Sequence, residues 1–301
     1  MTPELARTRC GYVALVGAPN VGKSTLINAL LGQKVSIVTA KPQTTRQRVI
    51  GIYNGHGAQI IFLDTPGLIT PKYLLHHRML SQAASAVSDA DIVAVMTEVA
   101  AGPSLPKEVE NVVSRCAGTK PVFLIINKAD TIFKPDLLPL IGAFSERRTF
   151  QEIIPVSALK EQNLEDLLHT LAQNLPEQPD FYPDDMLSEH PERFFVSEFI
   201  REGIFERFRD EVPYSTAVEI TEFKDREGSK AFIAADVIVE RDSQKAILIG
   251  RGGIALKSVG GKVRPVIERF LGRAVYLELT VKVRDRWRED ERMLNQLGYT
   301  E

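Results

Sequence analysis

The segment Gly17–Thr25 reads GAPNVGKST, and it decides the fold of the first half of the chain. It contains the complete pattern G-x-x-x-x-G-K-[ST], follows the apolar run 11–17 and opens a helical pattern. Glycine in such a loop lets backbone N–H groups turn toward phosphate oxygens, and the N-terminus of the following helix adds a favourable dipole. The segment therefore predicts a phosphate-binding loop between a strand and a helix.

Three side chains at the end of this loop have distinct expected roles. Lys23 should reach the β- and γ-phosphates of a nucleotide, Ser24 should offer its hydroxyl group to Mg²⁺, and Thr25 should lie near the α-phosphate. The other residues of the loop that we expect to bind the nucleotide are Gly17, Asn20, Val21 and Gly22.

The chain around the loop alternates short apolar runs with helical patterns. The runs are rich in β-branched residues and nearly continuous in apolar character, which suits strands buried on both faces. They occupy residues 11–17, 59–65, 91–96 and 120–127, with helical patterns at 25–32, 82–88 and 163–175. This alternation is typical of βαβ units, and it predicts an α/β domain with a mixed, mostly parallel sheet.

Two further motifs belong to the same predicted site. Asp64, near the end of the run 59–65, can hold Mg²⁺ through water. Gly67 of the sequence DTPG lets a backbone amide approach the γ-phosphate because it has no Cβ. Thr45, in the loop after the first helix, can complete the Mg²⁺ shell, with Thr44 as the alternative. Such a loop orders in the triphosphate state and loosens after hydrolysis.

The sequence NKAD at 127–130 predicts which base the site accepts. The Asp130 carboxylate can accept hydrogen bonds from N1–H and the exocyclic amine of guanine, whereas adenine offers neither donor. Asn127 and Lys128 would brace the base and the phosphate loop. A second segment whose backbone can contact guanine O6 consists of Ser157, Ala158 and Leu159. Together these motifs favour GTP over ATP.

A proline-rich, acidic stretch at 175–185 separates two parts of the chain. Proline removes a backbone donor and favours extended chain, so this stretch is typical of a linker. We predict a GTPase domain at 1–178, a linker at 179–189 and a smaller α+β domain at 190–301. The elements expected in the smaller domain are a helix at 198–212, strands at 215–223 and 230–240 joined by a hairpin at 224–229, helices on both sides of 250–253, and a strand at 274–283.

A second glycine-rich loop, GRGG at 250–253, lacks the Lys-Ser or Lys-Thr pair of a nucleotide-binding loop. It fits G-x-x-G between two helices, the centre of a KH domain, where the loop clamps a single-stranded nucleic-acid backbone. The helix-loop-helix after a strand pair predicts the type II arrangement. The expected RNA-binding residues are Ile249, Gly250, Arg251, Gly252, Gly253, Lys257, Lys262 and Arg264.

Charge and cysteine content narrow the functional classes. The net charge of −2 hides a basic segment, because residues 244–288 contain eleven Lys and Arg against three Asp and Glu. Such a segment predicts an anionic partner. Cys10 and Cys116 form neither a metal-ligand spacing nor a disulfide framework, which favours a reducing compartment. We expect no signal peptide, because the start MTPELARTRC lacks an apolar core. We also expect no membrane span, since no apolar run reaches about 18 residues.

Taken in order, GAPNVGKST, QTTRQR, DTPG, NKAD and SAL resemble the translation-factor-related class of GTPases. With the predicted KH domain and the C-terminal run YLELTVKVRDRWREDERMLNQLGY at 276–299, nearly the whole chain resembles the Era family of bacterial ribosome-assembly GTPases. The resemblance implies hydrolysis of GTP to GDP with Mg²⁺, recognition of the 3′ end of small-subunit (16S) rRNA, and a role in assembly and maturation of the immature small ribosomal subunit. It also implies a cytoplasmic protein with peripheral contact at the inner membrane, and we expect a monomer.

The residue after DTPG bears on how hydrolysis proceeds. Leu68 stands where Ras-like GTPases keep a glutamine that orients the attacking water, which an apolar residue cannot do. Asn20 resembles the asparagine that helps to hold a potassium ion in relatives with the same gap. We hypothesise that K⁺ supplies part of the missing charge stabilisation. The residues that the resemblance implies for hydrolysis are Lys23, Thr45, Gly67 and Asn20.

Some residues depart from the family pattern. His76 and His77 stand where relatives usually show a glycine and an acidic residue, and Thr97 stands where an aspartate is common. We expect both histidines to be polar surface residues. Trp287, the only tryptophan, lies among arginines and is expected to dock onto its own domain, with stacking on a base as the alternative.

Two other functions fit some of these features. A constitutive RNA-binding assembly protein with a structural nucleotide would bind RNA equally well in its GTP-analogue and GDP forms. A membrane-surface GTPase would place the basic segment on anionic lipid. The G-x-x-G loop between helices favours RNA over lipid.

Overall fold

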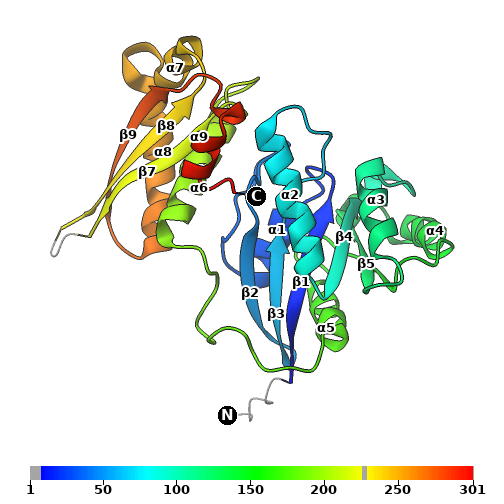
Figure 1. The fold of residues 1–301 in the computed structure, drawn as a ribbon. Coiled ribbons are helices and arrows are strands. Elements are labelled where there is room, and N and C mark those ends of the chain that lie inside the picture. The colour runs from blue at the N-terminus through cyan, green and yellow to red at the C-terminus, as the bar shows by residue number, and fades with distance from the viewer. Residues whose placement is uncertain (1–7, 226–228, 301) are drawn as a thin grey trace. The chain divides into compact units, whose positions relative to one another are not determined.

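A six-stranded sheet carries the predicted nucleotide motifs (Figure 1). Its strand order is β2-β3-β1-β4-β5-β6; β2 runs antiparallel to β3, and all other neighbours are parallel. The prediction of a mixed, mostly parallel sheet is therefore confirmed. The strands are β1 (Arg9–Gly17), β2 (Val49–Gly55), β3 (Ala58–Asp64), β4 (Ile92–Glu98), β5 (Val122–Asn127) and β6 (Glu152–Pro155).

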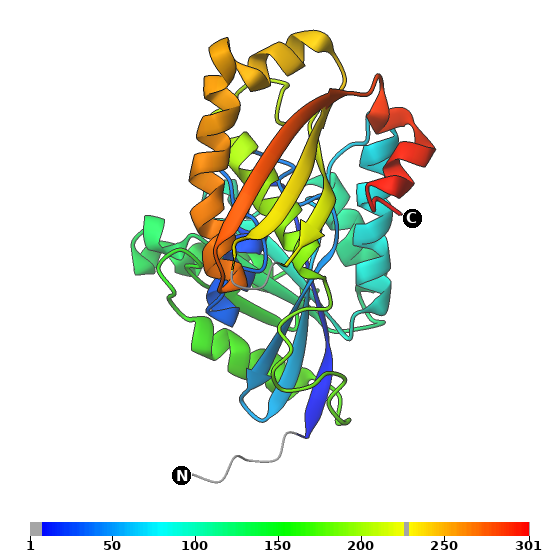
Figure 2. The ribbon, with the colours of Figure 1, turned by 90° about the vertical axis from the view of Figure 1, so that its left-hand side faces the viewer.

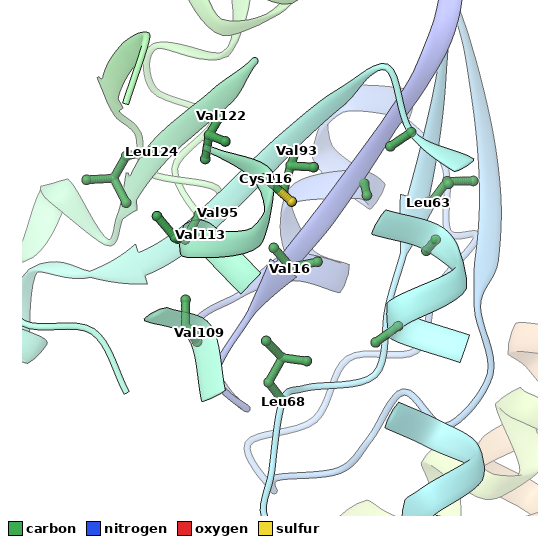
Figure 3. Close-up of a cluster of buried hydrophobic side chains, with 14 of the residues drawn as sticks. Val16, Leu63, Leu68, Val93, Val95, Val109, Val113, Cys116, Val122 and Leu124 are labelled. Atoms are coloured by element: carbon green, nitrogen blue, oxygen red, sulfur yellow. The ribbon is translucent and has the colours of Figure 1, made fainter. Parts of the chain in front are cut away.

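Helices cover both faces of this sheet. Successive side chains of one strand point to opposite faces, and both sets are therefore buried. In β1, Ala14 and Val16 belong to a hydrophobic cluster with residues of α2, α3 and α4 (Figure 3), whereas Val13 and Leu15 are buried outside that cluster. α1 and α5 both contact β1 and β3. The helices are α1 (Lys23–Leu31), α2 (Leu74–Asp89), α3 (Lys107–Cys116), α4 (Lys134–Ser145) and α5 (Leu164–Asn174), with short 3₁₀ turns η1 (Val99–Ala101) and η2 (Ala129–Thr131).

A second, three-stranded sheet has the order β7-β8-β9, antiparallel between β7 and β8 and parallel between β8 and β9. α6 and α8 pack on one face, and Figure 2 shows the sheet from its other face. The helix-strand-strand-helix-helix-strand order is the predicted one. The elements are α6 (Glu192–Arg207), β7 (Ala217–Lys224), β8 (Ala231–Val239), α7 (Asp242–Ile249), η3 (Arg251–Gly253), α8 (Ile254–Leu271), β9 (Val275–Val283), η4 (Trp287–Glu289) and α9 (Glu291–Gln296).

The computed structural model describes residues 8–225 and 229–300, so the tip of the predicted hairpin at 226–228 lies outside the described residues. The helix expected at 198–212 is present, but its predicted bounds are wrong: it begins at Glu192 and ends at Arg207. Phe208 is already extended, with φ −98° and ψ 157°. The ammonium group of Lys41 donates to the carbonyls of Phe205 and Phe208 and so satisfies the C-terminal end of the helix.

The chain divides into two compact units. The first contains the residues up to Ser36 together with Thr45–Pro71 and Met79–Glu189, and the second contains Ile37–Thr44, Lys72–Arg78 and the residues from His190 onward. Two short segments from the first half of the sequence, a loop at Ile37–Thr44 and the start of α2 at Lys72–Arg78, thus belong to the unit that carries the GRGG loop.

The stretch that we predict as a linker is fastened to the first unit. The Gln59 side chain accepts hydrogen bonds from the backbone N–H groups of Phe181 and Tyr182, both 2.9 Å, and donates to the Tyr182 carbonyl at 2.9 Å. The Ile52 N–H donates to the Leu187 carbonyl at 2.9 Å. None of the helices within the described ranges combines the length and apolar character that a membrane crossing needs.

Candidate functional site

The phosphate loop is closely packed at both of its motif glycines. A Cβ at Gly17 would lie 2.4 Å from the Met96 carbonyl oxygen. Gly22 has φ +98°, and a Cβ there would lie 2.2 Å from Nδ2 of Asn127. A side chain at either position would therefore displace the loop, so the backbone path itself requires glycine.

Lys23 is buried at the start of α1. Its ammonium group donates to the carbonyls of Gly17 at 3.2 Å and Ala18 at 3.1 Å, which holds the side chain under the loop. Burial lowers the pKa of Lys23 to about 8, and the nearby Asp64 carboxylate opposes that shift. A cation with so little water around it interacts strongly with any anion that enters the loop.

The three residues predicted to surround Mg²⁺ lie together. The Ser24 hydroxyl donates to Oδ2 of Asp64 at 2.7 Å and lies 2.9 Å from the Thr45 hydroxyl, which is 3.4 Å from the same carboxylate oxygen. The alternative residue, Thr44, instead bonds to the Thr39 hydroxyl and the Lys41 carbonyl. The structure therefore brings Thr45, and not Thr44, to Ser24 and Asp64.

The two oxygens of the Asp64 carboxylate differ in their hydrogen bonds: Oδ2 accepts several, and Oδ1 accepts none. Besides Ser24 and Thr45, the Ser36 hydroxyl donates to Oδ2 at 2.9 Å, whereas Oδ1 is buried without a hydrogen-bond partner. Burial raises the pKa of Asp64, and Lys23 together with the three hydroxyl groups opposes the shift. A buried carboxylate oxygen without a donor fits a site for a hydrated divalent cation, since hard cations prefer oxygen ligands.

DTPG contacts the phosphate loop directly. A Cβ at Gly67 would lie 2.9 Å from the backbone nitrogen of Pro19, and the Leu68 N–H donates to the Gly17 carbonyl at 3.0 Å. The Leu68 side chain points into the hydrophobic cluster near Val16 and Val109 (Figure 3). That side chain is therefore a core residue, which agrees with the expectation that it cannot orient water.

Asn127 joins three motifs. It is 3% exposed, its Nδ2 donates to the Val21 carbonyl at 2.8 Å, and its Oδ1 accepts from the Ala158 N–H at 3.0 Å. The phosphate loop, NKAD and SAL are thus held by one amide. Lys128, in a left-handed backbone conformation with φ 61°, forms an ion pair with Glu98 at the end of β4. The sequence gives no signal for Glu98.

The residues expected to meet the base are open to solvent. Asp130 is exposed, and Leu159 is 77% exposed. Ser157 is buried, and its hydroxyl accepts from the Lys160 N–H at 3.1 Å, which fixes the turn. Asn20, at the tip of the phosphate loop, is also exposed and left-handed with φ 65°. Thr25 is half-buried in the first turn of α1.

The segment Ile37–Thr44 packs against α6. Arg201 is 1% exposed and donates from Nη2 to the Thr44 carbonyl, while its Nε donates to Glu198 at 2.8 Å. Glu202, one residue on, accepts from the Val38 N–H at 2.9 Å. Together with the Lys41 contacts at the end of α6, these bonds fix the segment at both of its ends.

The segment Lys72–Arg78 shows that one prediction is wrong. His76 is buried rather than a surface residue: its ring lies 3.8 Å from that of Tyr73, and its Nε2 is 3.0 Å from Oε1 of Gln43. His77 is exposed, as predicted. The physical reason is that His76 packs against Tyr73 of its own segment and Gln43 of the segment Ile37–Thr44. No local sequence pattern reveals the second contact.

The same segment also contacts the C-terminal run. The Arg288 guanidinium lies 4.5 Å from the centre of the Tyr73 ring, in a cation–π contact. Arg78 is buried and donates to Asn295 at 3.1 Å and to Glu291 at 3.3 Å. The distinctive C-terminal sequence therefore binds a segment that lies close to DTPG along the chain.

The GRGG loop has the backbone that its glycines predict. Gly250, Gly252 and Gly253 have φ of 68°, 59° and 78°, and a Cβ at Gly250 would lie 2.7 Å from that of Ala255. Arg251 is exposed at the tip. The loop lies between α7 and α8, as expected.

Basic and apolar side chains surround this loop. Lys257, Lys262 and Arg264 are all exposed on α8, although Lys262 pairs with Glu206 at 2.6 Å. Ile249 is half-buried, while the neighbouring Ile247 and Ile254 are exposed. Exposed apolar groups beside cations are suited to nucleic acid, which offers flat bases and phosphates. Trp287 is fully buried and donates from Nε1 to the Ser215 carbonyl at 2.8 Å, so the prediction that it docks onto its domain is confirmed.

Comparison with known protein families defines the class. A family model described as "50S ribosome-binding GTPase" matches residues 12–128, and one described as "KH domain" matches residues 211–288. With the fold and the motifs above, these matches define a GTPase joined to a KH domain.

The similarity to individual proteins extends over nearly the whole chain. GTPase Era of Geobacter metallireducens is 47% identical over 97% of this chain and 98% of its own, and GTPase Era of Lacticaseibacillus paracasei is 46% identical over 96% of each. The chain belongs to the Era family of GTPases. It also matches a variant of Aquifex aeolicus Era bound to GDP·AlF4⁻, with a TM-score of 0.93 and 41% identity over 97% of this chain and 100% of that chain.

Another solved Era structure that this chain resembles contains RNA. The complex of Era with MgGDPNP and nucleotides 1506–1542 of 16S ribosomal RNA has a TM-score of 0.93 and 41% identity, over 98% of this chain and 100% of that chain.

Proposed function

We propose that this GTPase is a switch whose nucleotide state controls binding of the 3′ end of small-subunit rRNA, and that it acts in assembly and maturation of the small ribosomal subunit. One observation carries the switch: two consecutive residues belong to different units. The Thr45 hydroxyl lies at the predicted Mg²⁺ site, while the Thr44 carbonyl is held by Arg201 of the KH-containing unit. The RNA assignment is supported by the similarity to the Era complex with a 16S rRNA fragment.

The phosphate loop would bind the nucleotide with charges that are already in place. Backbone N–H groups at the start of α1 face the phosphates, and Lys23 exchanges its bonds to the Gly17 and Ala18 carbonyls for phosphate oxygens. Exposed Asp130 would pair with guanine, and Asn127 keeps the base-binding and phosphate-binding loops in register. The reaction is attack of water on the γ-phosphorus, with release of phosphate and GDP.

Ser24, Thr45 and Asp64 would hold Mg²⁺, and the buried Oδ1 of Asp64 is the oxygen available to it or to its water. The ion would supply charge neutralisation of the phosphates. The chain's own residues supply the rest: Lys23 provides a poorly hydrated positive charge, and Gly67 lets a backbone N–H come close to the γ-phosphate.

The proposal includes potassium because Leu68 replaces the glutamine that orients the attacking water in Ras-like GTPases. Leu68 lies in the hydrophobic cluster, so its side chain cannot orient the attacking water. Asn20 is exposed at the tip of the loop and can reach a monovalent cation beside the phosphates. We expect turnover to be faster in potassium than in sodium; equal rates would refute this part of the proposal.

The coupling to RNA runs through two segments. Ile37–Thr44 is bonded to α6 through Lys41 and Arg201, and Lys72–Arg78 is bonded to the C-terminal run through Arg78. Ile37–Thr44 continues directly into Thr45 of the nucleotide site, and Lys72–Arg78 follows DTPG a few residues later along the chain. A change in either segment on loss of the γ-phosphate therefore acts on the unit that contains the GRGG loop.

The test is binding of a fluorescent single-stranded oligonucleotide that matches the rRNA 3′ tail, against a scrambled oligonucleotide at fixed salt. We expect sequence-specific binding that is at least about tenfold tighter with a non-hydrolysable GTP analogue than with GDP, a coupling of about 1.4 kcal/mol. Arg251→Ala should weaken binding in both states, and Arg201→Met should reduce the difference between the states. Arg115→Ala, at an exposed position on α3, is the matched control.

Each other outcome excludes one reading. Tight, sequence-specific binding that is equal in the two nucleotide states would refute the switch and favour the constitutive RNA-binding protein. If the scrambled oligonucleotide binds equally well, and anionic vesicles bind more tightly than RNA, the basic face acts on lipid instead.

A further inference from the structure

Ser36 belongs to none of the nucleotide-binding motifs, yet it contacts the carboxylate of Asp64, which is predicted to bind Mg²⁺. Its side chain is 3% exposed, and its hydroxyl donates to Oδ2 of Asp64 at 2.9 Å. The other two hydroxyl groups on this oxygen come from Ser24 and Thr45, which would themselves bind the metal. Ser36 is therefore the one donor to Asp64 that has no other assigned task.

Asn28 fixes the backbone of Ser36. Its Oδ1 accepts from the N–H groups of Val35 and Ser36, both at 2.9 Å, and its Nδ2 donates to the Ser36 carbonyl at 2.7 Å. Asn28 follows Ser24 by four residues on α1, so both side chains lie on one face of the helix. The same helix face thus presents one magnesium-binding hydroxyl and clamps the residue that presents another hydroxyl to Asp64.

We propose that Ser36 is a positioning residue for the magnesium site, held in place by Asn28. It saturates Oδ2 of Asp64, so the carboxylate cannot rotate and Oδ1 stays directed toward the cation or its water. The inference rests on the proposed function of the nucleotide site. It adds residues that the motifs do not contain.

The position of Ser36 along the chain gives it a second consequence. It is the last residue of the first unit before Ile37–Thr44, and Thr45 is the first residue after that segment. Both donate toward the same oxygen of Asp64. The two ends of the segment are therefore tied to one atom, and an ion that binds Asp64 acts on both ends together.

A structural role alone makes a different prediction. If Ser36 only satisfies a buried carboxylate, its loss lowers the stability of the protein with and without metal by equal amounts. If it positions Asp64 for the cation, its loss changes the magnesium concentration that the site requires.

The experiment measures release of a fluorescent GDP analogue from the full chain during a Mg²⁺ titration that begins in EDTA. Ser36→Ala removes the hydroxyl, and Ser85→Ala makes the same change at an exposed position on α2 as the matched control. For Ser36→Ala we expect the Mg²⁺ concentration at half-maximal slowing of release to rise about tenfold, or about 1.4 kcal/mol, as for loss of a hydrogen bond to a charged group. The release rate in EDTA should equal that of the unchanged protein.

Two further variants guard against a folding defect. Ser36→Cys keeps the shape but donates more weakly, so its midpoint should lie between those of the unchanged protein and Ser36→Ala. Asn28→Ala should shift the midpoint in the same direction, and the double variant Asn28→Ala/Ser36→Ala should shift it no further than the larger single change, because both act through one contact.

A Mg²⁺ midpoint that is the same in Ser36→Ala and the unchanged protein would overturn the inference. So would a release rate that rises by one factor at every Mg²⁺ concentration, EDTA included. If the unchanged protein itself releases the analogue independently of Mg²⁺, the proposed magnesium site fails, and the positioning role fails with it; the two failures are thus distinguishable.

Discussion

Asn127→Ala is the most informative single change because one buried amide joins the phosphate loop to both base-binding motifs. The substitution removes the donor to the Val21 carbonyl at 2.8 Å and the acceptor for the Ala158 N–H at 3.0 Å. Each hydrogen bond contributes about 1 kcal/mol net, and a buried polar group left unsatisfied costs about 1–3 kcal/mol. For the two partners together we expect a loss of about 2–4 kcal/mol.

This loss is divided between two measurable quantities. Nucleotide titration with a fluorescent GDP analogue gives the change in binding free energy, and chemical unfolding of the nucleotide-free protein gives the change in stability of the GTPase unit. We expect the two changes to add to about 2–4 kcal/mol. Asn111→Ala, at an exposed position on α3, serves as the control and should change neither quantity by more than about 0.5 kcal/mol.

Asn127→Asp separates the two halves of the bridge. The carboxylate still accepts from the Ala158 N–H but cannot donate to the Val21 carbonyl, and it places a negative charge beside that oxygen. The aspartate variant should therefore bind GDP no better than Asn127→Ala. A combined loss below about 1 kcal/mol in Asn127→Ala, or GDP affinity in Asn127→Asp equal to that of the unchanged protein, would refute this account of the site.

Three other changes have definite expected results. Because burial lowers the pKa of Lys23 to about 8 and bound phosphate raises it again, GDP affinity should fall as pH rises through about 8; calorimetry in buffers of different ionisation enthalpy should show proton uptake there and almost none near about pH 6. Trp287→Phe strands the Ser215 carbonyl, and circular dichroism should show a loss of about 1–2 kcal/mol in unfolding free energy with unchanged GDP affinity. Gly203→Ala would place a Cβ 2.3 Å from Val263, so thermal unfolding should show a loss of about 1–3 kcal/mol that added Val263→Ala partly restores.

The magnesium cluster shows how far sequence reasoning reaches. Ser24, Thr45 and Asp64 are predictable because carboxyl ends of parallel strands and the loops beside them meet at one edge of a sheet. Ser36 reaches the same atom, but only through the turn that Asn28 clamps. No spacing rule in a single sequence records that turn, so the residue could not be found.

Two other differences have causes far away along the chain. α6 ends at Arg207, where Lys41, more than 160 residues earlier, donates to the carbonyls of Phe205 and Phe208, whereas the local sequence continues a helical pattern. Similarly, β2 (Val49–Gly55) is not among the strands predicted above, and its Gly51 packs so closely that a Cβ there would meet Leu31 of α1 at 2.6 Å. In both cases the decisive partner comes from another element.

The way in which the chain divides between its two units has a consequence for how the protein can be dissected. The polypeptide passes from one unit to the other five times, after residues 36, 44, 71, 78 and 189. Only the last of these passages corresponds to a cut that a gene fragment could use. A fragment that stops at residue 189 keeps every nucleotide motif but removes the partners of Lys41, Thr44 and Arg78. It is therefore a GTPase in which one loop and the start of α2 lack residues that they pack against. The turnover and the stability of such a fragment would reflect the loss of these contacts and not the properties of the GTPase unit in the intact protein. Both quantities should therefore be measured on the full chain.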